Sequence, residues 1–203
     1  MKTAASTAHD RHNTKTAPKK DRIHPRLLDQ LLSYDAATGN LFWKARTPDM
    51  FSATQCRTAE HICANWNSKN AGREALTADN GHGYLWGRIY GRQYLAHRVV
   101  WAMHSGSWPD ADIDHMDTNR TNNKIENLRP ASRSENMRNC RAHKDGASGK
   151  KGVTFNKKEG KWMARIMVHG KHHHLGRRLT PEAAHAAYCQ AAQALHGEFA
   201  RVA

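Results

Sequence analysis

The chain has 203 residues, and its 32 lysines and arginines against 18 aspartates and glutamates give a formal net charge of +14. This length suits one or two small domains, and so positive a chain favours a strongly negative partner such as nucleic acid. No apolar run approaches the roughly 18 residues of a membrane-spanning helix, and no long lysine-rich amphipathic helix suggests a membrane surface. These features exclude a membrane protein and predict a soluble, cytoplasmic one.

The start of the chain and its cysteines indicate no special structure. Residues 1–25 mix basic side chains with Thr, Ala and His and lack the apolar core of a secretory signal, so they predict a flexible basic tail. None of the four cysteines stands in a C-x-x-C pair, which argues against a zinc knuckle and a disulfide framework. We therefore expect reduced, mostly inert thiols.

Residues 26–95 have the pattern of a β-rich N-terminal region. Leucines recur on one helix face across residues 27–32 and predict a short helix, and residues 41–43 predict a strand. Residues 45–80 show no sustained period and yield no prediction. Residues 84–95 predict a hairpin with its turn near Tyr90-Gly91-Arg92.

The middle of the chain predicts two strands and a helix. Residues 96–104 favour a helix that Gly106 stops. Residues 112–116 can form a short strand that turn residues follow, and Ile125 and Leu128 supply the next buried anchors. Ser132 and Glu135 match the S-x-x-E capping box, which begins a helix and sets Asn136 in its first turn. The strands and the helix then converge on one small cleft.

Asp114 and His115 place a carboxylate beside an imidazole. Phosphodiester hydrolysis needs a base that deprotonates water and a charge that stabilises the phosphoryl group, and a bound cation can supply that charge. An imidazole with a pKa of roughly 6.5 is available as a base near neutral pH, so His115 suits the first task and Asp114 suits the cation. Neighbouring strand residues point to opposite faces, so the pair can share one phosphate only where the strand ends, bulges or twists.

The stretch from Ala96 through Asn139 resembles the HNH endonucleases of the phage and homing type. The motifs that carry the resemblance are Ile113-Asp114-His115, Glu126-Asn127-Leu128-Arg129 and Ser134-Glu135-Asn136-Met137-Arg138-Asn139. It implies an α+β fold with a ββα-metal core, or His-Me finger, at residues 96–140. It also implies that Asp114 and Asn136 hold Mg²⁺ or Mn²⁺, that His115 activates water, and that Asn127 supports the loop carrying His115. The third letter of the HNH family name is asparagine in this chain, which suits a hard cation better than zinc, so we expect no structural zinc.

Each of these residues also has a simpler interpretation. Asn127 can stabilise a turn, and Asn136 can be a solvated residue in the first turn of a helix. His97 either reaches a DNA phosphate or packs against the hairpin. Arg138 is a further candidate for contact with DNA.

Residues 141–150 have the Gly and Ser content of a linker, and residues 151–203 predict a second unit rich in Lys and Arg. Residues 161–168 alternate between apolar and partly basic positions, which predicts a strand, and residues 171–176 return as another. Thr180 as N-cap and Pro181 as first residue predict a helix that ends at Gly197. The apolar stripe of this helix comprises Ala184, Ala187, Tyr188, Ala191 and Leu195.

This second unit resembles the Apetala or ethylene-response-factor DNA-binding domain in Lys151-Gly152-Val153, in residues 160–166, in residues 174–176 and in residues 182–188. The resemblance implies a three-stranded antiparallel sheet packed on one helix, with the outward sheet face in the major groove. By this resemblance the candidates for contact with DNA are Lys151, Thr154, Asn156, Lys161, Arg165, His172 and His174. Several arginines and one DNA-facing tryptophan of that family are absent here, so its target sequence does not carry over. Trp162 shares the apolar phase of the strand, so we expect it in the core.

Together these features predict a metal-dependent endonuclease that cuts duplex DNA, positioned by its C-terminal sheet. We expect a monomer or weak dimer in the cytoplasm of a bacterial host cell or a phage-infected cell. A DNA-binding regulator with an inactive HNH core and an RNA-binding protein are the alternatives from other classes. A zinc protein is disfavoured, because the consecutive side chains of His172, His173 and His174 alternate along a strand and cannot share one ion.

Overall fold

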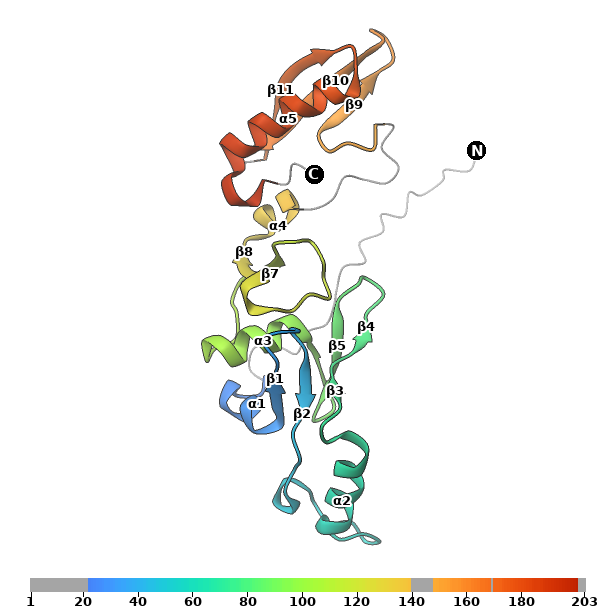
Figure 1. The fold of residues 1–203 in the computed structure, drawn as a ribbon, viewed down its shortest axis with the longest axis vertical. Coiled ribbons are helices and arrows are strands. Elements are labelled where there is room, and N and C mark those ends of the chain that lie inside the picture. Colours follow the sequence, from blue (N-terminus) through green and yellow to red (C-terminus); the bar gives the residue numbers. More distant parts are fainter. Residues whose placement is uncertain (1–21, 140–147, 169, 201–203) are drawn as a thin grey trace, which may run out of the picture.

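The structure is a computed structural model that describes residues 22–139, 148–168 and 170–200. Most of the expected basic tail and most of the expected linker lie outside the described residues. The described chain is elongated, with α2 near one end and the C-terminal sheet at the other (Figure 1). It is a mixed α/β protein with small antiparallel sheets. Within the described ranges, no helix is long and apolar enough to cross a membrane.

The N-terminal part contains two three-stranded sheets, β1-β2-β3 and β4-β5-β6. The expected short helix, the strand at 41–43, the hairpin and the helix that ends at Gly106 are all present. In chain order its elements are α1 (Pro25–Leu31), β1 (Leu32–Tyr34), β2 (Leu41–Trp43), η2 (Pro48–Met50), α2 (Ala59–Asn70), β3 (Glu74–Ala75), β4 (Ala78–Asp79), β5 (Leu85–Ile89), β6 (Arg92–Leu95) and α3 (Ala96–Ser105).

Helix α2 lies in the region for which the sequence pattern yields no prediction. Its only buried side chain is Cys63, so no apolar stripe marks it. Trp66 instead packs against the guanidinium of Arg46, whose carbon lies 3.8 Å from the ring centroid, and Trp43 meets Trp66 edge-on. Cation–π and aromatic contacts of this kind hold a helix without a 3.6-residue apolar period, which explains why the pattern misses it.

The middle of the chain forms a two-stranded antiparallel ladder followed by a short helix. Its elements are β7 (Asp112–His115), η3 (Ile125–Asn127), β8 (Leu128–Ala131) and α4 (Arg133–Asn139). The ladder sets Asp114 opposite Arg129 and His115 opposite Leu128. The capping box is formed, since Ser132 Oγ accepts from the Glu135 amide at 3.2 Å and Glu135 Oε2 accepts from the Ser132 amide at 2.8 Å. The order β, β, α agrees with the expected core.

One hydrophobic core joins the N-terminal part to this ladder. Its fully buried large side chains from α1, β1, β5 and α3 are Leu28, Leu31, Leu32, Ile89, Val99 and Val100. Ile113 of β7 and Leu128 of β8 belong to the same core. Burial of apolar area is the main favourable term in folding, so the strand that carries Asp114 and His115 rests on a rigid base.

The C-terminal unit is a three-stranded antiparallel sheet, in the order β11-β10-β9, with a helix on one face. Its elements are β9 (Val153–Asn156), β10 (Lys161–Val168), β11 (Lys171–Arg178), α5 (Pro181–His196) and η4 (Gly197–Phe199). Thr180 caps α5 as expected, because its Oγ1 accepts from the Ala183 amide at 3.2 Å. Ala164 and Ile166 of β10 are buried against α5.

Two details of this unit bear on the sequence prediction. Trp162 packs against the buried cluster of Val153, Ala164 and Ala184, as expected. The sequence pattern predicts Leu195 on the buried stripe, but 50% of it is exposed, and Ala192 and His196 face inward instead. The buried positions follow Ala184 in steps of four residues, so the stripe drifts away from Leu195.

Gly152 provides a test of the packing of this unit. It has a positive φ of 74°, and a Cβ there would overlap the ring of Tyr188, whereas Gly149, with φ 60°, has open space around it. Gly152→Ala should therefore lower the free energy of unfolding of the unit by about 1–3 kcal/mol more than Gly149→Ala, because overpacking adds to backbone strain. Hydrogen exchange of the β9–β11 amides measures the difference, and equal protection in both variants would contradict it.

Candidate active site

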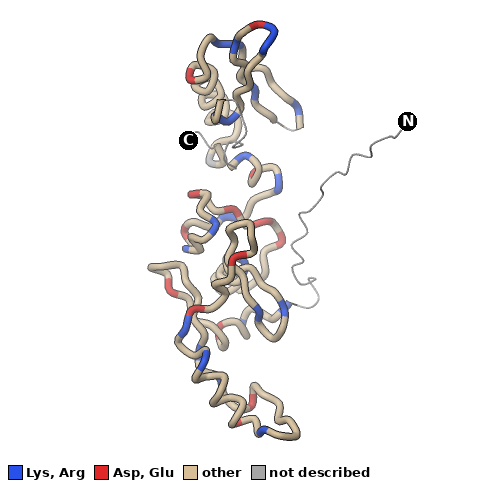
Figure 2. Tube along the Cα trace, turned by 90° about the vertical axis from the view of Figure 1, so that its right-hand side faces the viewer, with Lys and Arg blue, Asp and Glu red and all other residues tan. Residues whose placement is uncertain are grey.

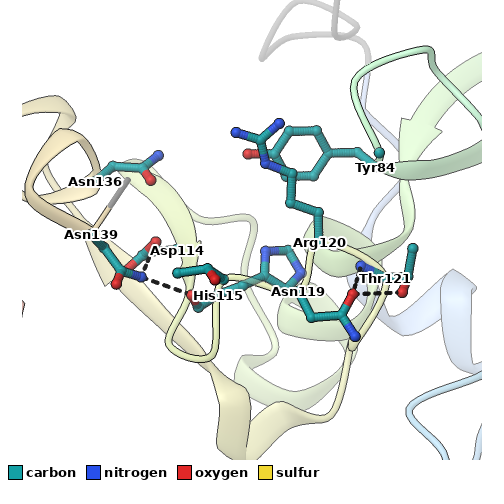
Figure 3. Close-up of a pocket in the computed structure, with 10 residues that line it drawn as sticks. Tyr84, Asp114, His115, Asn119, Arg120, Thr121, Asn136 and Asn139 are labelled. Carbon is teal, nitrogen blue, oxygen red and sulfur yellow. Dashed lines mark hydrogen bonds between the residues drawn. The ribbon is translucent and has the colours of Figure 1, made fainter. Parts of the chain in front are cut away.

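A cleft of about 470 Å³ opens where β7, α4 and two loops meet (Figure 3). The first loop joins β4 to β5, and the second follows β7. The residues that line the cleft are Gly83, Tyr84, Asp114, His115, Thr118, Asn119, Arg120, Thr121, Asn136 and Asn139. Three of the residues singled out from the sequence, Asp114, His115 and Asn136, therefore face one space.

Asp114 and His115 both reach this cleft because β7 ends at His115, where the following loop begins. The strand stops at His115, whose carbonyl accepts from the Thr118 amide at 2.9 Å in a tight turn with Thr118 at φ 62°. A strand that ends there no longer has to hold its last two side chains on opposite faces. The sequence predicts a strand end at this place as the condition for a shared site.

His115 is only 3% exposed. Its Nε2 lies 3.1 Å from the Asn123 Oδ1, so Nε2 carries the proton in this arrangement and Nδ1 keeps the lone pair. The rings of Tyr84 and His97 pack beside it, at centroid distances of 5.9 and 5.1 Å. Burial lowers the pKa of His115 below its usual value, against the smaller opposing effects of the Asn123 hydrogen bond and of Asp117 and Asp114. The neutral imidazole is thus the favoured form near pH 7.

Asp114, 5% exposed, is held by two partners. Arg129 Nε and Nη2 donate to its Oδ2 at 3.1 and 2.9 Å. Asn139 Nδ2 lies 3.1 Å from Oδ1 and 2.9 Å from Oδ2, and it also donates to the His115 carbonyl at 2.8 Å. Sequence reasoning left both partners without a role. The register of the β7–β8 ladder is the feature that points to Arg129. For Asn139, that feature is its position one helical turn beyond Asn136.

The donor atoms in the cleft suit a hard cation. Asp114 Oδ1 accepts one hydrogen bond from the described residues, whereas a carboxylate oxygen has about two acceptor sites, so Oδ1 can also bind a metal. Asn136 adds a carboxamide to the same cleft. The described residues contain no group of three or more His, Cys, Asp or Glu that could hold a metal, so carboxamide or water oxygens must complete any ligand set. Oxygen donors of this kind match Mg²⁺ or Mn²⁺.

Asn127 lies beneath the loop that follows His115. Its Oδ1 accepts from the Asp117 amide at 3.0 Å, and its Nδ2 donates to the Asp117 Oδ1 and the Asn122 carbonyl, both at 2.9 Å. It does not line the cleft. These contacts tie the start and the end of the loop to one side chain.

Arg120, which the sequence reasoning missed, lies in the cleft on the same loop. Its guanidinium lies over the ring of Tyr84, 4.8 Å from the centroid, and its Nη1 donates to the His82 carbonyl at 2.7 Å. No acidic partner of Arg120 occurs in the described part of the chain. Among the described residues, only the His82 carbonyl accepts a hydrogen bond from this guanidinium, which has five N–H donors.

His97 lies in the interior and does not contact DNA from the surface. It is 4% exposed and packs between Tyr84, at a centroid distance of 5.2 Å, and His115. Burial, and then the neighbouring His115, lower its pKa well below the usual value. Its place on the inward face of α3 corrects the expectation that it reaches a phosphate and agrees with the alternative of packing.

The strand candidates for DNA contact in the C-terminal unit share the sheet face opposite α5. Register pairs Lys161 with Asn156, Arg165 with His174, and Met167 with His172, and paired residues project from the same face. Thr154 joins them opposite Met163. Lys and Arg recur along these strands and their turns (Figure 2).

Lys151 and Arg138 lie elsewhere, at the junction with the middle part. The Lys151 ammonium donates to the Arg138 carbonyl at the end of α4. Both side chains are half-buried. These two candidates are therefore separate from the outward sheet face.

Comparisons with known proteins place this cleft in context. The family model described as HNH endonuclease matches residues 94–138, which include Asp114, His115, Asn127 and Asn136. Protein 3.8 of Escherichia phage T7 is 35% identical over 106 residues, which cover 52% of this chain and 87% of that protein. No solved structure matches the chain.

Proposed function

The chain belongs to the same family as Protein 3.8 of phage T7 and contains an HNH endonuclease domain, and from this premise we propose that it is a metal-dependent endonuclease that hydrolyses phosphodiester bonds of duplex DNA. The observation that supports this most is the meeting of Asp114, His115 and Asn136 in one cleft with Arg120, for which the described residues offer no acidic partner. One such site per chain cuts one strand, so a monomer nicks the duplex, whereas two copies together can cut both strands.

His115 is the general base in this proposal. Its Nδ1 accepts the proton of the attacking water, since Nε2 is turned to Asn123. A buried, neutral imidazole is ready for that proton near pH 7. Asn123 fixes the tautomer and the ring orientation, and Asn127 keeps the loop after His115 in place.

Asp114 and Asn136 would hold Mg²⁺ or Mn²⁺. When bound, the cation supplies Lewis-acid stabilisation of charge on the phosphoryl group and on the departing oxygen. Arg129 and Asn139 keep the Asp114 carboxylate in one orientation, as supporting hydrogen bonds do for metal ligands in general.

Arg120 binds the phosphate under attack. A guanidinium matches two phosphate oxygens through parallel N–H donors, and stacking on Tyr84 limits the orientations of this one. It lies in the same cleft as His115. The cation site and the guanidinium then share the charge that builds up on the phosphoryl oxygens.

The C-terminal unit grips duplex DNA through its outward sheet face. We assign it, as an Apetala or ethylene-response-factor-like domain, the contacts of Thr154, Asn156, Lys161, Arg165, His172 and His174, with Lys151 and Arg138 as phosphate contacts at the junction. Support comes from the shared face of the strand residues and the local excess of Lys and Arg. Basic contacts of this kind supply affinity, whereas base contacts from a groove supply specificity.

His115→Ala tests the enzyme. The variant should nick supercoiled plasmid in Mg²⁺ about 10²- to 10⁴-fold more slowly, the usual contribution of a general base, while DNA affinity stays unchanged. His104→Ala, which removes an exposed imidazole of α3, is the matched control and should cut normally. EDTA should abolish cleavage, and Mn²⁺ should restore it. Full activity in His115→Ala would refute the assignment, and wild-type protein that binds but never cuts would favour a regulator with an inactive core.

Arg120→Ala tests the phosphate contact. The variant should cleave about 10²-fold more slowly at saturating DNA, because an oriented donor to the developing charge is lost. Arg120→Lys should recover only part of the rate, since a point charge lacks the bidentate fork. Arg88→Ala, which removes an exposed arginine from β5, serves as control. Equal single-turnover rates for the two alanine variants would rule out this role.

Arg165→Ala tests the sheet face. Fluorescence anisotropy over a salt series, without divalent cation, measures DNA binding by the variant. If Arg165 contacts a phosphate, the slope of the binding constant against salt should fall by about 1. If Arg165 contacts a base, the variant should lose about 1–3 kcal/mol of sequence preference. Arg73→Ala removes an exposed arginine of the N-terminal part and should change neither quantity. Identical binding curves for both variants would remove the sheet from the DNA interface.

A further inference from the structure

The Arg129 guanidinium contacts one described residue in its plane and another against its face. In its plane, it donates two hydrogen bonds to Asp114 from Nε and Nη2. Against its face lies the ring of Phe199, whose centroid is 3.7 Å from the guanidinium carbon. A planar guanidinium can stack on a ring and bind a carboxylate at the same time, and the side chain is only 13% exposed.

Phe199 belongs to the C-terminal unit, whereas Arg129 belongs to β8. α5 ends at His196, and Gly197, whose φ of 54° and ψ of −130° suit glycine, turns the chain into η4, which carries Phe199. α5 itself is fixed to the sheet by Ala184 and Tyr188. The place of the Phe199 ring is therefore set by the packing of the C-terminal unit.

A second contact joins the same two parts of the molecule. Lys151, just before β9, donates to the Arg138 carbonyl at the end of α4, and η4 lies against α4 as well (Figure 1). Buried His196 lies near Arg138 and Lys151, whose positive charges lower its pKa after the larger effect of burial. The C-terminal unit thus touches both α4, which carries Asn136 and Asn139, and β8, which carries Arg129.

We propose that the C-terminal unit completes the active site as well as gripping DNA, with Phe199 as a positioning residue that holds Arg129 on Asp114. This inference rests on the proposed function. Without the ring, the Arg129 guanidinium loses its stacking contact, and the arginine gains other orientations. Asp114 then loses part of the constraint that fixes the orientation of its carboxylate at the cleft. Cleavage should depend on this contact even when DNA remains bound.

The contact is tested first by NMR of arginine side chains in the full chain. The Arg129 Nε–Hε signal, assigned by its loss in Arg129→Lys, should carry a ring-current shift that Phe199→Leu removes and Phe199→Trp keeps. Leucine is chosen because it keeps an apolar side chain at this position. Leu195→Ala, which removes an exposed apolar group from α5, is the control and should leave the signal in place. An Arg129 signal that does not move in Phe199→Leu overturns the proposal.

The consequence for the site is tested by cleavage and by metal binding. Phe199→Leu should lower kcat and the affinity for Mn²⁺, measured by electron paramagnetic resonance, each by about 10- to 100-fold, the usual effect of removing support from a metal ligand. The Kd for duplex DNA without divalent cation should stay at the wild-type value. Phe199→Trp and Leu195→Ala should behave as wild type. Unchanged kcat and Mn²⁺ affinity in Phe199→Leu overturn the inference.

These readouts separate the two proposals. If the wild-type chain does not cleave DNA, the proposed function fails, but the Mn²⁺ titration and the Arg129 signal still decide whether Phe199 positions the site. If wild type cleaves and Phe199→Leu cleaves equally fast, the proposed function stands and the role of Phe199 is rejected.

Discussion

The carboxylate of Asp114 lies almost entirely out of water, and its pairing constrains the rest of the site. A buried, unpaired carboxylate costs several kcal/mol, so the fold must bring a cation and a hydrogen-bond donor to it. β8 supplies Arg129 through the ladder register, and α4 supplies Asn139 through its length. Three elements therefore converge on one side chain. The capping box of α4 matters for the same reason, because it fixes where the helix begins.

The loop after His115 holds a buried imidazole at the edge of the cleft. Its shape depends on carboxamide hydrogen bonds rather than on apolar packing, with Asn127 beneath it and Asn123 turned to the imidazole. Short polar side chains can satisfy backbone groups within a few residues, so such a loop keeps its form while one side faces an open cleft. Arg120 lies on that open side, with its guanidinium over the ring of Tyr84.

Charges are arranged differently in the two halves of the molecule. In the HNH domain the buried charge of Asp114 is paired, whereas most basic groups of the C-terminal sheet are exposed. Exposed cations interact with a polyanion at long range and are screened by salt, while a paired, buried charge fixes geometry. The division suits the function proposed above, in which one part holds DNA and the other acts on it. Phe199 links the two parts through a single stacked ring.

Local signals let the sequence alone predict the capped helices, the hairpin, the ladder and the presence of Asp114, His115 and Asn136 in one cleft. Each signal spans a few residues, because caps, turns and apolar periods act within one or two turns of chain. Other features came only from the tertiary structure: α2, which packs on Arg46, and the inward turn of His97. They depend on which distant surface each side chain meets, and a sequence window does not contain that surface. The partners of Asp114 and the contact of Phe199 with Arg129 were decided in the same way, by elements far apart in the chain.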